Sequence, residues 1–398
     1  MFKNLACLCC ENSVNSKDDK YKYKVKDTYD TSKSQISNKN PSVNETQIQH
    51  QKIDLKDFQV IRLLGKGSFG KVVLVKRFDS DKIYAMKIIN KNLITTQTKI
   101  NHTKIERIVL EKLNHPFIAK LQYAFQQENH LYLITEFLQG GDLFFHLTRE
   151  KCFKEVKVKF YAAQIFLAID YLHKNGYIYR DLKPENILLD NKGYIKLTDF
   201  GLCKLVTNEN INEKYTICGT LSYIAPEILM GKSYDYSVDW FSFGVVIYVL
   251  LCGEFPFESK KEPKYDEKVY KQKVKYPEKM SNEAKDIISK LLEIKPRKRL
   301  GYNNSDEIKN HEFFKDIDFE QIYLKKYKPI FKPNLKGNLD LKYFDINFLD
   351  DKDFYTEDSS EKNKNDGDEK NLDFGVFKDF SFQKEETVDE EEEESELY

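Results

Sequence analysis

The sequence predicts an α+β fold of two unequal lobes, a small strand-rich lobe with one helix and a larger, mostly helical lobe. Runs of β-branched and aromatic residues between 58 and 134 favour short strands around a single helix. Beyond Gly140 and Gly141 the apolar spacing is mostly helical, with strand-like interruptions at 186–189 and 194–197. We therefore expect the sheet to precede the helical lobe in the chain.

Within the small lobe, four strands and one helix are expected in a fixed order. A glycine-rich loop separates the first two strand-like runs, which predicts a hairpin. The spacing of Ile105, Ile108 and Val109 predicts a helix before the last strand. The four strand-like runs are 58–64, 71–75, 83–89 and 131–134.

Polar segments flank the expected folded domain, residues 58–314. Residues 1–57 are rich in Lys, Asn, Ser and Asp and have no periodic pattern, so we expect a disordered arm. Residues 315–398 are expected to form an irregular tail with an acidic end. The 64 Lys and Arg residues balance the 64 Asp and Glu residues, which argues against nucleic-acid binding.

Membrane insertion and secretion are not expected. The longest apolar stretch is 243–252, well short of the ~20 residues that a membrane span needs. Seven cysteines without a paired framework fit a reducing, cytoplasmic compartment. Cys7, Cys9 and Cys10 could accept palmitate and bring the chain to a membrane, but unmodified thiols are the favoured alternative.

Residues 65–72, Gly-Lys-Gly-Ser-Phe-Gly-Lys-Val, carry glycines where backbone N–H groups could approach phosphates. An ordinary glycine turn is the alternative. Lys87 lies inside an apolar strand, where a buried ammonium group needs partners. We expect phosphate oxygens and the Glu106 carboxylate to be those partners. A lysine snorkelling at the sheet edge is the other interpretation.

Three further motifs follow in the helical part. Residues 179–186 read Tyr-Arg-Asp-Leu-Lys-Pro-Glu-Asn, 199–201 read Asp-Phe-Gly, and 225–227 read Ala-Pro-Glu. With the glycine loop and Lys87 they match the signature set of protein kinases in identity, order and spacing. Residues 58–314 therefore resemble a protein kinase, and the two lobes resemble the bilobal fold of that family.

This resemblance implies ATP and Mg²⁺ as cofactors and Ser or Thr of protein substrates as acceptors. Asp181 would accept or orient the hydroxyl proton, and Lys183 would neutralise the transferring phosphate. Asn186 and Asp199 would bind the metal. Lys87, held by Glu106, would bind the nucleotide phosphates. The residues expected around ATP are Leu64, Gly65, Lys66, Gly67, Ser68, Phe69, Gly70, Lys71, Val72, Ala85, Lys87, Thr135, Glu136, Leu138 and Leu188.

Two other classes of function were compared with an active kinase. Loss of Lys87, Asp181, Asn186 or Asp199 would have favoured a pseudokinase scaffold, and all four residues are present. A small-molecule phosphotransferase would not need the activation loop, the Ala-Pro-Glu element or a phosphorylated tail. An active protein kinase is therefore the leading hypothesis.

Several features narrow the resemblance to the AGC group of serine/threonine kinases. Tyr179 stands where most protein kinases carry His, a substitution common in that group. Thr216 matches its activation-loop phosphosite. Residues 377–382, Phe-Lys-Asp-Phe-Ser-Phe, match its hydrophobic motif, with Ser381 as acceptor. The motifs look most similar to the Akt and ribosomal-protein-kinase branch, but we expect no lipid-binding domain because 57 residues are too few.

The same resemblance implies how the chain is switched on. An upstream kinase or the chain itself would phosphorylate Thr216, and Arg180, Lys204 and His102 would bind that phosphate. Phosphorylated Ser381 would act on the helix of Glu106. The turn-motif phosphosite is open among Thr356, Ser359 and Ser360.

Asp142 and Glu185 are expected to recognise a basic residue three positions upstream of the acceptor. Val249 stands where arginine-directed relatives carry an acid, which weakens the preference two positions upstream. We expect the protein to act as a monomer on protein substrates.

Overall fold

The fold is that of a computed structural model, which describes residues 53–67, 70–206, 218–257, 270, 272–345 and 374–384. Several residues named above lie outside the described residues: Cys7, Cys9, Cys10, Ser68, Phe69, Thr216, Thr356, Ser359 and Ser360.

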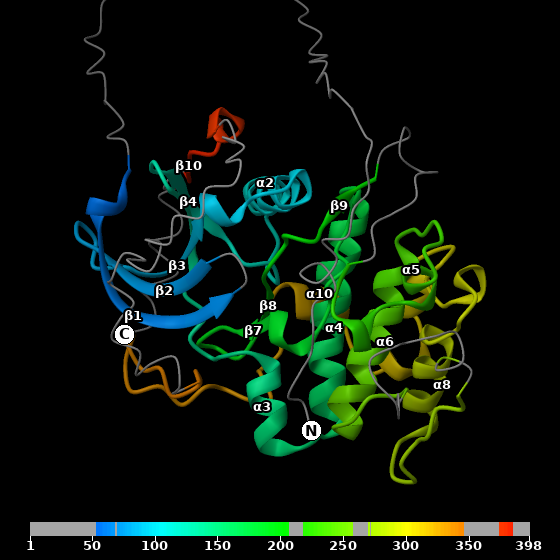
Figure 1. The fold of residues 1–398 in the computed structure, drawn as a ribbon. Helices are drawn as coiled ribbons and strands as arrows, with labels where there is room; N and C mark the ends of the chain where they lie inside the picture. The colour runs from blue at the N-terminus through cyan, green and yellow to red at the C-terminus, as the bar shows by residue number, and fades with distance from the viewer. Residues whose placement is uncertain are drawn as a thin grey trace, which may run out of the picture.

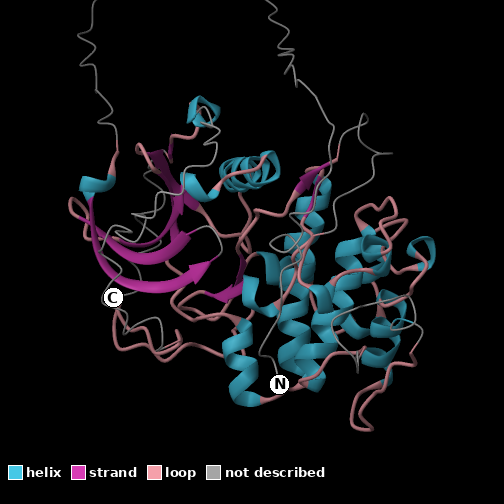
Figure 2. Ribbon diagram, viewed as in Figure 1, coloured by secondary structure: helices cyan, strands magenta, loops and turns pink. Residues whose placement is uncertain are grey.

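The small lobe is an antiparallel sheet with strand order β1-β2-β3-β5-β4-β10 (Figures 1 and 2). Its strands are β1 (Phe58–Gly67), β2 (Gly70–Arg77), β3 (Ile83–Asn90), β4 (Leu121–Gln126), β5 (His130–Glu136) and β10 (Phe382–Gln383). Val73, Met86 and Ile134 are fully buried, as the alternating apolar pattern requires. The sixth strand, β10, comes from the far end of the chain.

Helix α2 (Gln97–Lys112) is the helix expected between the third and fourth strands, and it lies against the sheet (Figure 1). The Thr96 hydroxyl accepts a hydrogen bond from the Lys99 N–H and so caps the helix. Ile100, Val109 and the charged Glu106 are buried on its inner side. The helix therefore carries one carboxylate into the interior of the molecule.

The large lobe packs helices around α6, of which nearly every residue is buried, with α4 and α8 against it. Two short antiparallel pairs, β6–β9 and the hairpin β7–β8, also belong to this lobe, and β7–β8 lies on the side of the small lobe (Figure 1). The strands are β6 (Tyr177–Ile178), β7 (Ile187–Leu189), β8 (Ile195–Leu197) and β9 (Lys204–Leu205). The helices are α3 (Leu143–Glu150), α4 (Glu155–Lys174), α5 (Pro226–Leu229), α6 (Ser237–Cys252), α8 (Asn282–Leu291), α9 (Asp306–Lys309) and α10 (Phe319–Tyr323).

The expected two-lobed α+β fold is confirmed. The structure differs at the end of the expected arm, because Leu55–Asp57 form a 3₁₀ turn. Asp54 accepts a hydrogen bond from the Lys56 N–H, and its own N–H donates to the Asp57 carboxylate. This reciprocal capping orders residues that composition alone assigned to a disordered segment.

The first part of the tail packs closely on the large lobe. A Cβ on Gly193, where φ is +97°, would lie 1.9 Å from the Phe331 carbonyl oxygen. Further along, the ring of Phe344 stacks on Phe137, directly after β5, with centroids 5.6 Å apart. The tail therefore runs along the side of the molecule where β5 leads into the large lobe.

Every helix in the described part of the chain is too short or too polar to cross a lipid bilayer.

Candidate active site

Lys87 lies between two acids that come from different parts of the chain. Its Nζ is 2.6 Å from Glu106 Oε1 on α2 and 3.5 Å from Asp199 Oδ1. Burial opposes the charged amine, but the charges of Asp199 and Glu106 outweigh it and raise the pKa of Lys87. The Lys87 side chain is 32% exposed to solvent. A permanent cation is therefore available to an anion between the lobes.

Asp181, Lys183 and Asn186 form one hydrogen-bonded cluster. Asn186 Nδ2 donates to Asp181 Oδ2 at 2.8 Å, and Lys183 Nζ lies 2.9 Å from the same oxygen. Burial, reinforced by the charge of Asp199, raises the pKa of Asp181. A carboxyl group with a raised pKa and a cation beside it is suited to accept a proton from a hydroxyl group.

Thr220 is a member of this cluster that sequence reasoning missed. Its Oγ1 donates to Asp181 Oδ1 at 3.0 Å and accepts from Lys183 Nζ at 2.8 Å. It lies four residues after Thr216, the only residue of this segment that the sequence singled out. The hydroxyl ties the segment before the Ala-Pro-Glu element to Asp181.

Asp239 on α6 is a second residue that sequence reasoning missed. Its fully buried carboxylate accepts the backbone N–H groups of Tyr179 and Arg180, both at 2.8 Å, and contacts His173 at 2.7 Å. Arg180 has φ of +68°, a strained value for a residue with a side chain. Asp239 therefore holds the unusual backbone conformation that precedes Asp181.

Asp199 and Asn186 offer oxygen ligands for a metal. The charge of Lys87 lowers the pKa of Asp199, whose side chain is half exposed. Asn186 donates through its amide nitrogen to Asp181, which turns its amide oxygen toward other partners. The described residues hold no group of three His, Cys, Asp or Glu placed around a metal. This donor set fits Mg²⁺, which takes one or two protein carboxylates together with substrate phosphates.

The glycine loop is open at its first two glycines and closely packed at the third. A Cβ on Gly65 would meet nothing within 4 Å, and one on Gly67 only the Gly70 carbonyl oxygen at 3.9 Å. At Gly70 a Cβ would lie 1.8 Å from the Ile88 carbonyl oxygen. The first two glycines therefore leave space open, and the third permits close contact with β3. Lys66 is exposed and Lys71 half-buried.

The residues expected around the adenine ring share one burial pattern. Leu64, Val72, Ala85 and Leu188 are half-buried. Their chain neighbours Leu63, Val73, Met86 and Leu189 are fully buried. Each half-buried residue therefore alternates with a core residue and faces the other side of its strand, as a surface that receives a flat ring would require.

The segment that links the lobes contains Thr135, Glu136 and Leu138. Ala85 pairs with Thr135 across β3 and β5, and Leu138 is buried. The Glu136 N–H donates to the Lys120 carbonyl oxygen at 3.1 Å. The backbone group that Glu136 could offer to a base is therefore its carbonyl.

Asp142 and Glu185 are both acids in a buried setting. Asp142 caps α3, accepting the Phe145 N–H at 2.7 Å, and burial raises its pKa to about 6. Burial also raises the pKa of Glu185. Within the described chain, Glu185 Oε2 is buried and has no hydrogen-bond partner. An orphaned carboxylate oxygen of this kind favours a donor supplied by a ligand.

The three expected phosphate ligands differ in character. Arg180 is buried and donates to the Leu202 carbonyl oxygen and the Tyr234 hydroxyl. Lys204 pairs with Ile178 across β6 and β9. Burial, together with the charge of Arg180, lowers the pKa of His102 to about 4, so His102 is neutral in this state. Sequence reasoning did not foresee this, because burial is set by distant residues.

The tail residues around Ser381 lie on the small lobe. Phe377 and Phe380 are buried, and Gln126 Nε2 donates to the Phe377 carbonyl oxygen at 2.6 Å. Arg107 on α2 donates to the carbonyl oxygens of Phe380 and Ser381 at 3.1 and 3.2 Å. Ser381 itself is exposed. The tail is thus attached to the helix that carries Glu106.

Glu227 of the Ala-Pro-Glu motif forms a bidentate pair with Arg299. The two hydrogen bonds measure 2.7 and 3.0 Å, and both side chains are buried.

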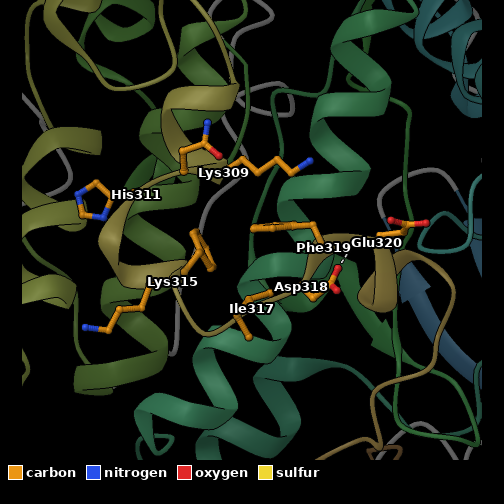
Figure 3. A pocket seen from close by; sticks show the side chains of 9 residues that line it. Lys309, His311, Lys315, Ile317, Asp318, Phe319 and Glu320 are labelled. Carbon is orange, nitrogen blue, oxygen red and sulfur yellow. Dashed lines mark hydrogen bonds between the residues drawn. The ribbon is translucent and has the colours of Figure 1, made fainter.

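A cavity of about 470 Å³ lies elsewhere, around α9 and α10 (Figure 3). None of the predicted site residues lines it. Its walls are Lys309, Asn310, His311, Phe314, Lys315, Ile317, Asp318, Phe319 and Glu320. The candidate active site is therefore the region around Lys87, Asp181 and Asp199, where the charged groups converge.

Comparison with known proteins identifies the family of this chain. Residues 58–314 match the family model described as the protein kinase domain. The chain is 44% identical over 301 residues to a RAC family serine/threonine-protein kinase homolog of Dictyostelium discoideum, across 76% of this chain and 67% of that one.

Two further relatives come from other organisms. Serine/threonine-protein kinase YPK2/YKR2 of Saccharomyces cerevisiae is 43% identical over 300 residues, across 75% of this chain and 44% of that one. Human RAC-beta serine/threonine-protein kinase is 42% identical over 299 residues, across 75% of this chain and 62% of that one. The matched region spans about half to two thirds of these relatives. The chain belongs to the protein kinase family, and within it to the AGC group of serine/threonine protein kinases.

Proposed function

We propose that this protein transfers the γ-phosphate of ATP to Ser or Thr hydroxyl groups of protein substrates. The observation that carries the proposal is the cluster of Asp181, Lys183 and Thr220, in which one carboxylate is held by an ammonium and a hydroxyl group. Within it, Asp181 accepts or orients the proton of the incoming hydroxyl group. Lys183 offsets negative charge on the transferring group.

Lys87 binds and orients the nucleotide phosphates in this proposal, and Glu106 holds Lys87 in place. The 2.6 Å pair between them supports these roles. Asn186 and Asp199 hold Mg²⁺, which supplies charge neutralisation at the phosphates when it is bound. The open space at Gly65 and Gly67 supports a phosphate-binding role for the loop.

Substrates with a basic residue three positions upstream of the acceptor are the proposed preference. The buried, unpartnered Glu185 Oε2 supports it, since a guanidinium group would satisfy that oxygen. Asp142 contributes a second carboxylate, whose charge also acts on Glu185. Val249 is fully buried, which supports a weaker preference at the second upstream position.

Phosphorylation of Thr216 and Ser381 is the proposed switch, with an upstream kinase or the chain itself acting on Thr216. Attachment of the tail to α2 through Arg107 supports the second input, because α2 also carries Glu106. Phosphate adds about −1.5 to −2 charges at either site. A neutral His102 beside Arg180 would gain a proton if phosphate approached it.

Action as a monomer in the cytoplasm completes the proposal. Cys152, Cys203, Cys218 and Cys252 form no disulfide with one another within the described residues, which is in keeping with a reducing compartment.

The test uses the full chain, a serine peptide with arginine three positions upstream, and Mg²⁺-ATP. Asp181→Asn should lose about 10²- to 10⁴-fold in turnover and keep its affinity for a non-hydrolysable ATP analogue. Asp316→Asn, which changes a side chain with 70% exposure on the surface, is the matched control. A wild-type chain that binds the analogue without transferring phosphate would instead be a scaffold.

A further inference from the structure

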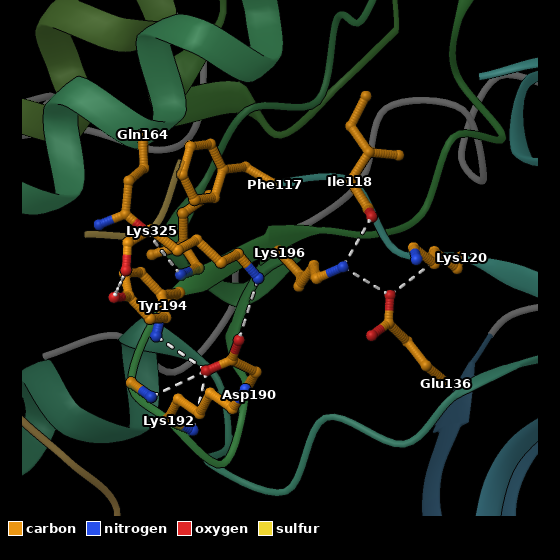
Figure 4. Close-up of polar contacts among 12 residues, drawn as sticks. Phe117, Ile118, Lys120, Glu136, Gln164, Asp190, Lys192, Tyr194, Lys196 and Lys325 are labelled. Carbon is orange, nitrogen blue, oxygen red and sulfur yellow. Dashed lines mark hydrogen bonds and ion pairs between the residues drawn. The ribbon is translucent and has the colours of Figure 1, made fainter. Parts of the chain in front are cut away.

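Lys196 is a buried lysine that sequence reasoning did not single out. It lies on β8, and its side chain is 4% exposed. Its Nζ is 2.8 Å from Glu136 Oε1 and 3.3 Å from the Ile118 carbonyl oxygen (Figure 4). A buried ammonium group is costly unless such partners satisfy it. Its partners come from two other segments of the chain.

Those three segments meet where the two lobes join. Ile118 and Lys120 lie between α2 and β4, Glu136 ends β5, and Lys196 belongs to the large lobe. The Lys120 N–H also donates to Glu136 Oε1, at 2.8 Å. One carboxylate oxygen therefore accepts from both the small-lobe connection and β8 (Figure 4).

Backbone hydrogen bonds hold Lys196 against this junction. The Ala119 N–H donates to the Leu197 carbonyl oxygen at 2.9 Å, and the Leu197 N–H donates to the Phe117 carbonyl oxygen at 2.9 Å. Leu197 lies two residues before Asp199. The position of the Lys196 ammonium group is therefore fixed by the strand that leads to the proposed metal ligand.

The tail packs against the other side of the β7–β8 hairpin, which contains Lys196. The Tyr194 hydroxyl donates to the Tyr327 carbonyl oxygen at 2.7 Å, and Lys325 lies 3.4 Å from Asp190 (Figure 4). Burial, with the charge of Lys196, lowers the pKa of nearby His115 to about 4. Lys325 therefore pairs with Asp190, whereas Lys196 pairs with Glu136 and donates to the Ile118 carbonyl oxygen.

We propose that Lys196 is a positioning residue for nucleotide binding. Through Glu136 it fixes the end of β5 to β8 and to the α2–β4 connection, and so sets how the lobes face each other across the nucleotide. The inference rests on the proposed function, since it assigns the Glu136 backbone to the nucleotide. We call this Lys196–Glu136 contact the latch, and it is formed in the same structure in which Lys87 pairs with Glu106.

Four variants test the latch. Lys196→Met and Glu136→Gln each remove one charge of the pair, and Lys196→Arg keeps a cation that can still donate. Lys325→Met is the matched control, because it removes a tail lysine that pairs with Asp190 on the same hairpin and leaves the Lys196–Glu136 contact intact. This control also removes the contacts of the Lys325 ammonium group with the rings of Phe117 and Tyr194, 5.9 and 5.2 Å from their centroids.

Lys196→Met and Glu136→Gln should each raise the KM for ATP about five- to tenfold and change kcat less than about twofold. The affinity for a non-hydrolysable ATP analogue should fall by the same factor. The double variant should be no worse than either single one, because both break one pair. Lys196→Arg should recover most of the affinity, and Lys325→Met should match the wild type.

A folded Lys196→Met variant with wild-type KM and analogue affinity would overturn the latch. The same rise in KM and the same fall in kcat in both Lys196→Met and Lys325→Met would also overturn it, because that result would indicate general destabilisation. Failure of the proposed function looks different. If no variant and no wild-type chain transferred phosphate, while the analogue affinities still followed the order above, the latch would stand and the kinase proposal would fail.

Discussion

Two ion pairs of nearly equal length differ in how far they are exposed to solvent. Lys87 and Glu106 are 2.6 Å apart, and Arg299 and Glu227 are 2.7 Å apart. The Lys87 side chain is 32% exposed, whereas that of Arg299 is 0% exposed. The first pair joins elements of the small lobe beside a third charge, Asp199, and the second is sealed inside the large lobe.

The difference in accessibility, rather than in distance, predicts different roles for the two pairs, because an exposed pair can still meet a ligand. Arg299 also donates to the carbonyl oxygens of Glu293 and Ser237, so its bonding capacity is used within the protein. Lys87 keeps capacity for a ligand. Breaking the sealed pair should therefore cost stability, and breaking the open pair should cost activity.

Glu227→Gln should have the largest effect. It leaves a buried guanidinium group with an uncharged partner, so the free energy of unfolding should fall by about 3–5 kcal/mol. Urea unfolding monitored by circular dichroism measures this. The control is Glu312→Gln, which breaks an exposed pair with Lys315 and should cost no more than about 1 kcal/mol. A Glu227→Gln variant as stable as that control would contradict the stabilising role of the Glu227–Arg299 pair.

Lys87→Met should behave in the opposite way. Phosphate transfer to a peptide should fall by about 10²- to 10³-fold, because a charge-stabilising donor is lost. Stability should change little, since burial already raises the pKa of Glu106 and lets it accept a proton. Thermal unfolding and peptide phosphorylation, measured on one preparation, separate the two effects. Unfolding as severe as in Glu227→Gln would contradict this assignment.

The pair of Arg107 and Glu111, at 2.7 Å, lies between these extremes, with side-chain exposures of 14% and 30%. Arg107 also binds the tail backbone beside Phe380, which is buried. Phe380→Ala should release the tail and lower kcat/KM by roughly tenfold, since a buried aromatic anchor is lost. Lys378→Ala, at an exposed position of the same segment, is the control. Equal activity of the two variants would make the tail a passive attachment.

The smallest effect is expected from a change at Asp142. Its carboxylate accepts hydrogen bonds from backbone N–H groups instead of pairing with a cation. Burial raises its pKa from 3.8 to about 6, so the charged form gains population as pH rises through 6. The KM for a peptide with arginine three positions upstream should therefore fall several-fold between pH 5 and 7. Asp142→Asn, which can still cap α3, should lose this pH dependence.

The same shift makes a statement about stability. Folded Asp142 binds its proton more tightly than the unfolded chain does, so its contribution to stability decreases as pH rises from about 4 to 6. The melting temperature of Asp142→Asn should thus gain on the wild type across that range. A constant difference between the two chains would mean that Asp142 titrates normally.

Sequence alone predicted the fold and the family because their signals are local. Strand and helix periods mark the lobes, and phosphate chemistry demands particular residues at particular spacings around Asp181. The catalytic and nucleotide-binding roles of the individual residues remain predictions.

What sequence could not predict depends on contacts between distant segments. Lys196 is one of many lysines, and only its proximity to Glu136 and Ile118 makes it distinctive. The sequence predicted His102 as a phosphate ligand but gave no sign that burial and the charge of Arg180 lower its pKa to about 4. Thr220 and Asp239 lacked a signal for a similar reason, because their partners lie tens of residues away.

The pairing of β10 with β4 has a consequence for how the chain folds. Phe382 pairs with Ala124, so the edge of the small-lobe sheet is completed by residues near the end of the chain. During synthesis β4 emerges long before its neighbour, and an uncovered strand edge is a template for association with other chains. Nascent or truncated chains that lack residues 374–384 should therefore be prone to aggregate through β4. Within the described residues, β10 is the last strand in chain order, and we expect it to protect the edge that β4 would otherwise expose.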